Sequence, residues 1–270
     1  MAERRVSRRG AKDGHLDLAR ARILICNDDG IEAPGIKLLA RVARRFTSDV
    51  WVVAPEQEQS GASHSLTLHR PLRVRKLGPR RFAVDGTPTD CVLLAVNAVL
   101  QDKRPDLVLS GVNGGGNMGE DVTYSGTVAA AMEASLLGLR AIALSQHVAE
   151  DGKVNWTIAE AWAGRVIRRL AALPWLRDTL YNVNFPDVPP SAVKGVIAAA
   201  QGGRKIGDHL LERVDPRGRP YYWIGPQRDE EHAPAGSDVR AIAAGYVTVT
   251  PIFLDLTHRK ALAKLKKALA

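Results

Sequence analysis

Short apolar segments alternate with amphipathic segments between residues 23 and 186, and this alternation restricts the fold more than any other feature. Apolar or alternating segments predict strands at 23–26, 50–55, 66–78, 81–86, 105–113, 140–146 and 180–186. Helical periodicity or helix-start residues occur between them, at 35–46, 87–100, 126–138 and 156–173. Buried strands joined by helices predict an α/β fold. We expect a three-layer, Rossmann-like architecture in which helices cover both faces of a mostly parallel sheet.

The pattern changes after residue 195. Segments 195–201, 221–226 and 246–254 predict strands, with polar, Pro- and Gly-rich connections and no helix between them. We interpret residues 195–245 as a β-rich C-terminal arm that belongs to a single domain spanning residues 22–256.

The net charge of +9 lies entirely at the two ends of the chain. Residues 1–22 carry seven Lys or Arg and three acids, and residues 257–270 carry five Lys or Arg and no acid. A nucleic-acid-binding domain would carry its basic patch on the folded body, so no specific nucleic-acid binding is expected. We predict that residues 1–21 form a basic, disordered extension and that residues 257–270 form a basic helix.

The chain shows no signal for a membrane or an oxidising compartment. No apolar run approaches the length of a membrane-spanning helix, and the polar N-terminus lacks the apolar core of a secretory signal. Cys26 and Cys91 both lie in apolar segments, which is typical of free thiols in a reducing compartment. We therefore expect a cytoplasmic protein without a membrane partner.

Polar residues follow several predicted strands, at the edge of the sheet where α/β proteins bind ligands. The first strand leads into Asp28 and Asp29, the second is followed by Ser60, and a later strand ends in Asn113. Carboxylate, hydroxyl and amide oxygens form a hard donor set that suits Mg²⁺ or Mn²⁺. A divalent cation would also offset the repulsion between the adjacent carboxylates. The alternative is that one aspartate caps the next segment while the other is solvated.

A second cluster opens the alanine-rich helix. Ser125, Gly126 and Thr127 offer hydroxyls and backbone N–H groups at the positive end of this helix, which suits a phosphate group. Simple N-capping by Ser125 is the alternative, and the two roles are compatible. Asn117, in the preceding glycine-rich loop, is a further candidate for contact with phosphoryl oxygens.

Other kinds of site are not expected. Residues 114–119 satisfy G-x-G-x-x-G, but no helix starts where the motif ends, and the acid Glu133 falls inside a helix. A dinucleotide site is therefore not predicted. The chain also lacks a Walker motif, G-x-S-x-G and zinc-type histidine spacing. His64 lies in the Ser60 loop, where we expect an exposed histidine.

Five segments occur in order between residues 22 and 256: ILICNDDGIEAPGI, VVAPEQEQSGASHSLTL, GTPTDCV, DLVLSGVNGGGNMGEDVTYSGTVAAAMEA and YWIGP. Together they closely resemble the SurE family of 5′/3′-nucleotidases, the stationary-phase survival proteins. The resemblance implies one divalent cation per subunit, with ligands matching Asp28, Asp29, Ser60 and Asn113. It places the segment Tyr124–Thr127 beside the metal. It also implies a homodimer or homotetramer in which the β-rich arm is exchanged between subunits.

The chain departs from the family at a few positions. Glu32 stands where the family often has His, and Gly114, Gly115 and Gly116 stand where it often has Ala-Gly-Pro. None of these positions is a carried-over ligand, although Glu32 adds a third acid near the expected site. The family usually begins at its first strand, so residues 1–21 are additional.

We predict a metal-dependent phosphomonoesterase, a 5′-nucleotidase that hydrolyses nucleoside monophosphates to nucleoside and phosphate. Asp28 and Asp29 are the expected catalytic residues, and one of them is expected to orient or deprotonate the attacking water. Asp29 is the candidate we name first, but the sequence does not decide between the two. The sequence does not decide between 5′ and 3′ phosphates. One alternative is a non-catalytic nucleotide-binding module. The other is an aspartyl-phosphate phosphatase of the haloacid-dehalogenase type, whose D-x-D motif differs from the adjacent acids here.

Overall fold

The structure, a computed structural model, describes residues 14–148, 152–203, 210–224 and 233–269. Its elements follow in the order β1 (Ile23–Cys26), α1 (Pro34–Arg44), β2 (Val50–Pro55), β3 (Val74–Gly78), β4 (Arg81–Val84), α2 (Pro88–Leu94), η1 (Ala95–Val99), β5 (Leu107–Asn113), η2 (Gly119–Thr123), α3 (Gly126–Leu136), β6 (Arg140–Gln146), α4 (Thr157–Ala171), β7 (Thr179–Phe185), η3 (Pro190–Ala192), β8 (Val196–Ala198), β9 (Leu210–Val214), β10 (Pro220–Ile224), α5 (Asp238–Ala243), β11 (Val247–Phe253) and α6 (Arg259–Ala268). No helix in these ranges is long and apolar enough to cross a membrane.

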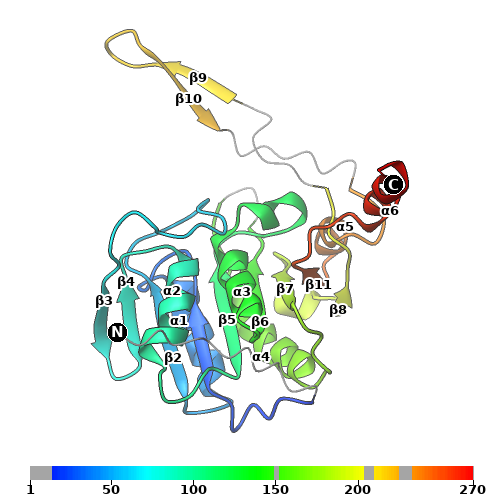
Figure 1. The fold of residues 1–270 in the computed structure, drawn as a ribbon. Helices are drawn as coiled ribbons and strands as arrows, with labels where there is room; N and C mark the ends of the chain where they lie inside the picture. Colours follow the sequence, from blue (N-terminus) through cyan, green and yellow to red (C-terminus); the bar gives the residue numbers. More distant parts are fainter. Residues whose placement is uncertain (1–13, 149–151, 204–209, 225–232, 270) are drawn as a thin grey trace.

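Nine strands form one sheet in the order β3-β4-β2-β1-β5-β6-β7-β11-β8 (Figure 1). The strands from β4 to β7 run parallel, whereas β3 pairs antiparallel with β4 and β11 antiparallel with β7. The mostly parallel sheet predicted from the sequence is confirmed. Because β1 lies between β2 and β5, the sheet grows from β1 in both directions. The carboxyl end of β1 is therefore at the switch point where open α/β sheets bind ligands.

The side chains of β1 point alternately to the two faces of the sheet, which explains the three layers. Ile23 and Ile25 belong to the core that α1 and α4 cover, whereas Leu24 and Cys26 belong to the core that α2 and α3 cover. All four side chains are fully buried, as expected for a parallel strand with helices on both sides. The predicted helix-covered architecture is thus confirmed.

Local sequence signals explain where α2 and α3 begin. The hydroxyl of Thr87 accepts a hydrogen bond from the backbone N–H of Asp90, and the Asp90 carboxylate accepts one from the N–H of Thr87. This capping box satisfies two N–H groups that the helix cannot use internally. Ser125 caps α3 by accepting a hydrogen bond from the N–H of Val128. Gly138, with a φ of 75°, follows the end of α3.

The prediction of no helix between residues 195 and 250 was wrong. The helix α5 occupies Asp238–Ala243, and its first turn is capped by the hydroxyl of Ser237. Six residues are too few to display a helical period clearly, so the cap and the following glycine, Gly245, were the available signals. In addition, β8 pairs with β11 in the large sheet instead of belonging to a separate arm. The strand expected at 66–78 begins only at Val74.

Only β9 and β10, among the described strands, form a sheet of their own. They pair antiparallel around a turn at Asp215, where the N–H of Gly218 donates to the Asp215 carbonyl. Every residue of both strands is exposed, and Figure 1 shows the hairpin projecting away from the large sheet. The apolar side chains Tyr222, Trp223 and Ile224 consequently face solvent.

The end segments differ in how they meet the domain. Residues 14–21 pack against it: the N–H of Leu16 donates to the carbonyl of Ala171, the last residue of α4, and Ala21 is buried. Residues 1–13 of the expected disordered extension lie outside the described residues, so that prediction stays a prediction. The helix α6 occupies the C-terminal segment for which a basic helix was predicted, and it has no buried residue.

Candidate functional site

Asp28 is the most buried carboxylate at the end of β1, with a residue exposure of 4%. The hydroxyl of Thr127, at the start of α3, donates a hydrogen bond to its Oδ1. Burial raises the pKa of Asp28, and the hydrogen bonds from Thr127 oppose that shift. The second residue of α3 therefore holds the carboxylate that the sequence analysis placed at the centre of the site.

Asp29 lies beside Asp28 and is less buried. Burial, followed by the negative charge of Asp28, raises its pKa from the ordinary value of 3.8 to about 7. A hydrogen bond from the backbone of Gly114 partly opposes this shift. Gly114 belongs to the glycine-rich loop after β5, so this contact joins the ends of two adjacent strands.

Ser60 approaches the same edge through its loop. The N–H of Gln59 donates to the carbonyl of Asp28 at 2.8 Å, which fixes the backbone next to Ser60 against the end of β1. On the far side of the loop, Ser63 donates its N–H to the carbonyl of Tyr124 and its hydroxyl to the carbonyl of Thr123. The loop after β2 is thus attached both to Asp28 and to the segment that leads into α3.

Asn113 ends β5, the strand beside β1, and is partly buried. Its side-chain NH₂ donates to the carbonyl of Gly115 at 2.7 Å. This hydrogen bond occupies the donor end of the amide and leaves its oxygen as the acceptor end. Asp28, Asp29, Ser60 and Asn113 therefore all belong to strand ends or loops at one edge of the sheet.

The helix start that was predicted to bind phosphate packs directly on Asp28. A Cβ atom added to Gly126 would lie 2.7 Å from Cβ and 2.9 Å from Oδ2 of Asp28, so only glycine fits at this position. Ser125 and Thr127 use their hydroxyls within the protein, as the cap of α3 and as the donor to Asp28. The segment therefore supplies the anticipated cap of α3 and packs against Asp28, while its binding of phosphate stays a prediction.

Asn117 lies deeper than its predicted role suggests. Its side-chain NH₂ donates to the hydroxyl of Ser145, and its backbone N–H donates to Oδ1 of Asn184, each at 2.8 Å. Its carbonyl accepts hydrogen bonds from the side chains of Asn182 and Asn184. These contacts anchor the glycine-rich loop on β6 and β7, so the side-chain donor of Asn117 is engaged within the protein.

Sequence reasoning missed Glu58. Its charge raises the pKa of both Asp28 and Asp29, and its Oε1 accepts a hydrogen bond from the hydroxyl of Ser60 at 2.8 Å. Glu58 precedes Ser60 by two residues, but only the path of the loop brings it near the strand end. Glu32, the acid that the sequence analysis placed near the site, instead pairs with Arg81 and Lys37.

His64 is tied to α3. Its Nε2 lies 3.0 Å from Oε2 of Glu133, whose side chain is 11% exposed. The histidine predicted to be exposed is therefore partly buried, because the Ser60 loop folds down onto the helix.

The residues at this edge fit a hard cation. In the described part of the chain, no group of three or more His, Cys, Asp or Glu side chains is arranged to hold a metal ion. A cation here would need the hydroxyl and amide oxygens in addition to the two aspartates. The buried Asp28 and the partly buried Asp29 are adjacent, and the negative charge of Glu58 acts on both. A divalent cation would balance this concentration of negative charge.

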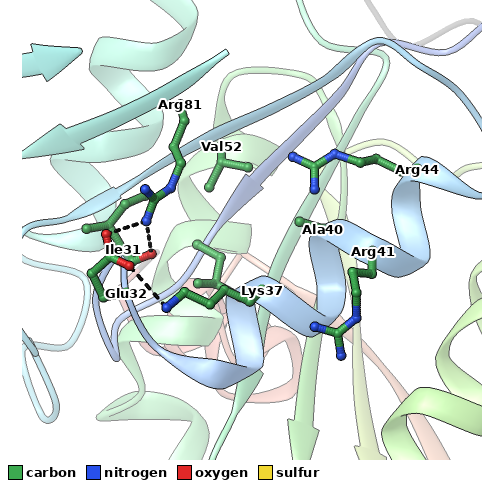
Figure 2. A pocket seen from close by; sticks show the side chains of 9 residues that line it. Ile31, Glu32, Lys37, Ala40, Arg41, Arg44, Val52 and Arg81 are labelled. Carbon is green, nitrogen blue, oxygen red and sulfur yellow. Dashed lines mark hydrogen bonds and ion pairs between the residues drawn. The ribbon is translucent and has the colours of Figure 1, made fainter. Parts of the chain in front are cut away.

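Two cavities lie beside β2 and β4, the strands on one side of β1. One, of about 210 Å³, is lined by residues of the Ser60 loop and the end of β4, among them Gln59 and Asp85. The other, of about 260 Å³, lies between α1 and the strands β2 and β4 and is lined by none of the predicted site residues (Figure 2).

The fold and the residues at the carboxyl end of β1 define the class of protein. It is an α/β protein with a carboxylate-rich site at the switch point of a mostly parallel sheet. The family model described as "Survival protein SurE" matches residues 23–208. The chain is 60% identical over 252 residues to 5′-nucleotidase SurE of Paramagnetospirillum magneticum, covering 93% of this chain and 97% of that protein. It is 59% identical over 244 residues to 5′-nucleotidase SurE of Rhodospirillum rubrum, covering 89% and 93%.

A solved structure agrees with these sequence matches. The crystal structure of SurE from Aquifex aeolicus superposes with a TM-score of 0.81 at 39% identity, covering 92% of this chain and 99% of that one. The chain belongs to the SurE family. The resemblance found in the sequence is therefore confirmed.

Proposed function

We propose that this chain is a 5′-nucleotidase that hydrolyses nucleoside 5′-monophosphates and that it depends on one Mg²⁺ or Mn²⁺ ion per subunit. The relatives named above carry the name 5′-nucleotidase, which supports the reaction and the substrate class. Activity on 3′-monophosphates is a further part of the proposal that the original resemblance implies.

The observation that carries the proposal is the pair of adjacent carboxylates, of which Asp28 is buried and Asp29 is partly buried. Asp28 and Asp29 both have raised pKa values, and both are affected by the further negative charge of Glu58. Keeping two such groups ionised together requires a compensating positive charge. We assign the metal ligands as Asp28, Asp29, Ser60 and Asn113. When bound, a divalent cation supplies Lewis acidity toward the phosphate and lowers the pKa of a water molecule.

The chain's own residues hold and move the proton. Thr127 fixes one carboxylate oxygen of Asp28, which keeps that side chain oriented toward the edge of the sheet. Asp29 has a pKa of about 7 before any cation is present. A carboxylate at the less buried position is suited to orient the attacking water or to accept its proton. The sequence left open which of the two aspartates handles the water, and this proposal assigns that role to Asp29.

The start of α3 receives the phosphate in this proposal. Its positive end stabilises the negative charge that spreads over the phosphoryl oxygens during transfer. The hydroxyl of Thr127 already donates to Asp28, whereas the hydroxyl of Ser125 only accepts a hydrogen bond as the cap of α3 and keeps its proton to donate. The helix end therefore acts through the backbone around Gly126 and through the Ser125 hydroxyl. The nucleoside would lie in the cavity of about 210 Å³ that is lined in part by Gln59 of the Ser60 loop.

The assembly and location of the protein are also proposals. The exposed hairpin of β9 and β10 presents Tyr222, Trp223 and Ile224, and contiguous exposed apolar side chains of this kind mark interaction surfaces. We propose that the hairpin joins subunits of a homodimer or homotetramer. A cytoplasmic location is consistent with two buried free cysteines.

The direct test is phosphate release from AMP by the full chain, with and without Mg²⁺ or Mn²⁺. Asp28→Asn should abolish turnover and weaken Mn²⁺ binding, measured separately by calorimetry. Asp17→Asn is the matched control, because the Asp17 side chain is 64% exposed and precedes β1, whose other end leads into Asp28. The proposal fails if the wild-type protein releases no phosphate from any nucleotide with either metal.

Two other activities are separated by the same assays. If the wild-type protein binds AMP without releasing phosphate, the chain is a nucleotide-binding module. If a phosphorylated aspartate is trapped during turnover, the reaction is that of an aspartyl-phosphate phosphatase.

A further inference from the structure

A groove on the α1 face of the sheet lies outside the nucleotidase site. Its volume is about 260 Å³, and it is lined by Ile31, Glu32, Ile36, Lys37, Ala40, Arg41, Arg44, Val52 and Arg81 (Figure 2). The groove exists because α1 packs on β1 and β5 more than on β2. The neighbouring strands β2 and β4 therefore form one wall, while the side chains of α1 form the other.

The groove carries excess positive charge. Four of its side chains are cationic, and Glu32 is its one carboxylate. Glu32 accepts contacts from Arg81 at 2.5 Å and from Lys37 at 3.0 Å. Arg44 has no ion pair with any residue that the structure describes, and its guanidinium extends toward Val52 (Figure 2). Arg41 pairs with Glu160 outside the groove at 3.7 Å, so among the described residues Arg44 is the cation of the groove that no carboxylate neutralises.

The floor of the groove is apolar. Ile31, Ile36, Ala40 and Val52 are all at most 5% exposed, and they continue into the main hydrophobic core. Apolar surface surrounded by a few fixed charges is typical of small-molecule sites. A volume of about 260 Å³ suits a compact ligand, not a macromolecule.

We propose that this groove binds a small phosphate- or phosphonate-bearing anion with a compact apolar body. Arg44 and Arg81 bind the doubly charged head from the α1 side and the β4 side. The apolar body lies on Ile36, Ala40 and Val52. Guanidinium groups match the planar oxygen pairs of such a head better than ammonium groups do.

The site is also connected to the segment that carries the catalytic aspartates. Nη2 of Arg81 donates to the carbonyl of Ile31 at 3.0 Å as well as to Glu32. Ile31 follows Asp29 by two residues, and its N–H donates to the carbonyl of Pro55 in β2. An anion in the groove therefore competes with Glu32 for a guanidinium that also contacts this segment.

Phenylphosphonate is the probe, because it combines a dianionic head with an apolar ring and has no phosphoester bond to hydrolyse. Methyl NMR of the full-length protein reports binding at the groove itself, through Ile31, Ile36 and Val52. We expect these methyl signals to shift to saturation. Arg44→Gln should weaken the affinity at least about tenfold, since it removes a charge-assisted hydrogen bond without disrupting an ion pair within the described residues.

Controls separate this groove from the nucleotidase centre. Arg45→Gln should leave the titration unchanged, because Arg45 is on the same helix end but does not line the groove. Asp28→Asn should abolish AMP hydrolysis and preserve the groove shifts. Methylphosphonate, which lacks the ring, should bind more weakly.

The proposal is overturned if the groove methyls do not shift to saturation, or if they titrate identically in Arg44→Gln. It is equally overturned if Asp28→Asn removes the shifts, because the probe would then bind only at the nucleotidase centre.

Discussion

The hydroxyl of Thr127 donates a hydrogen bond to the carboxylate of Asp28, although the two residues are 99 positions apart in the chain. Both side chains are buried, and Gly126 leaves room for the carboxylate beside the helix. The contact connects the strand end that supplies the predicted metal ligands to the helix start that was predicted to receive phosphate.

Replacing Thr127 tests whether this contact positions Asp28. Thr127→Val keeps the shape of the side chain but removes the donor, so we expect AMP hydrolysis to fall about 10- to 100-fold. Thr127→Ser, which retains the hydroxyl, should recover most of that loss. The measurement is kcat together with the concentration of Mn²⁺ that gives half-maximal activity. Equal activities of the Val and Ser variants would contradict a positioning role.

Gly126→Ala should inactivate the enzyme by sterically displacing Asp28. The added Cβ would lie 2.7 Å from the Cβ of Asp28, a separation that must be relieved by movement of one of the two elements. Gly78→Ala is the control, since its added Cβ would meet its nearest neighbour, the Cβ of Arg81, only at 3.9 Å. Phosphate release should be lost in the first variant and unchanged in the second. Circular dichroism checks that both variants are folded.

Asp29 should make the metal-free protein less stable as the pH rises. Its folded-state pKa of about 7 exceeds the ordinary value of 3.8, so the folded protein binds this proton more tightly than the unfolded chain. The stabilisation is present below the ordinary pKa and is lost as the pH rises through about 7. The melting temperature of the metal-free protein should therefore fall as the pH rises from about 4 to above 7. The fall should be smaller in Asp29→Asn, which has no carboxylate to ionise at this position.

A bound divalent cation should restore the stability that the metal-free protein loses as the pH rises. Because a cation binds the ionised carboxylates, Mn²⁺ should raise the melting temperature more at about pH 8 than at about pH 5. Thermal melts at both pH values, with and without Mn²⁺, measure the effect. An increase that is the same at both values would argue against the aspartates as ligands.

The hairpin should control the oligomeric state. Trp223→Ser removes an indole of β10 that is 63% exposed, and we expect it to shift the protein toward a 29.2 kDa monomer. Leu256→Ser is the control, because Leu256 is 94% exposed but lies outside the hairpin. Sedimentation velocity distinguishes the species. Equal sedimentation of both variants would exclude the hairpin as the interface.

The main sheet and its helices were largely predictable because their signals are local. The strands β1, β5 and β6 are buried on both faces. Their sequences are therefore short apolar runs, which predict strands from the sequence alone. Helix starts at Thr87 and Ser125 are likewise encoded within a few residues. The helix α5 escaped prediction because its six residues are too short to show a period.

The sequence by itself determined the alternation of strands and helices, and it determined which oxygen-bearing residues follow the strands. Only the tertiary structure decided that Thr127 holds Asp28, that Glu58 and not Glu32 acts on the carboxylate pair, and that Asn117 is anchored on β6 and β7. Strand and helix signals arise from neighbours in the chain. Hydrogen bonds and charge effects depend on distances through space, which are set only when the loops pack together.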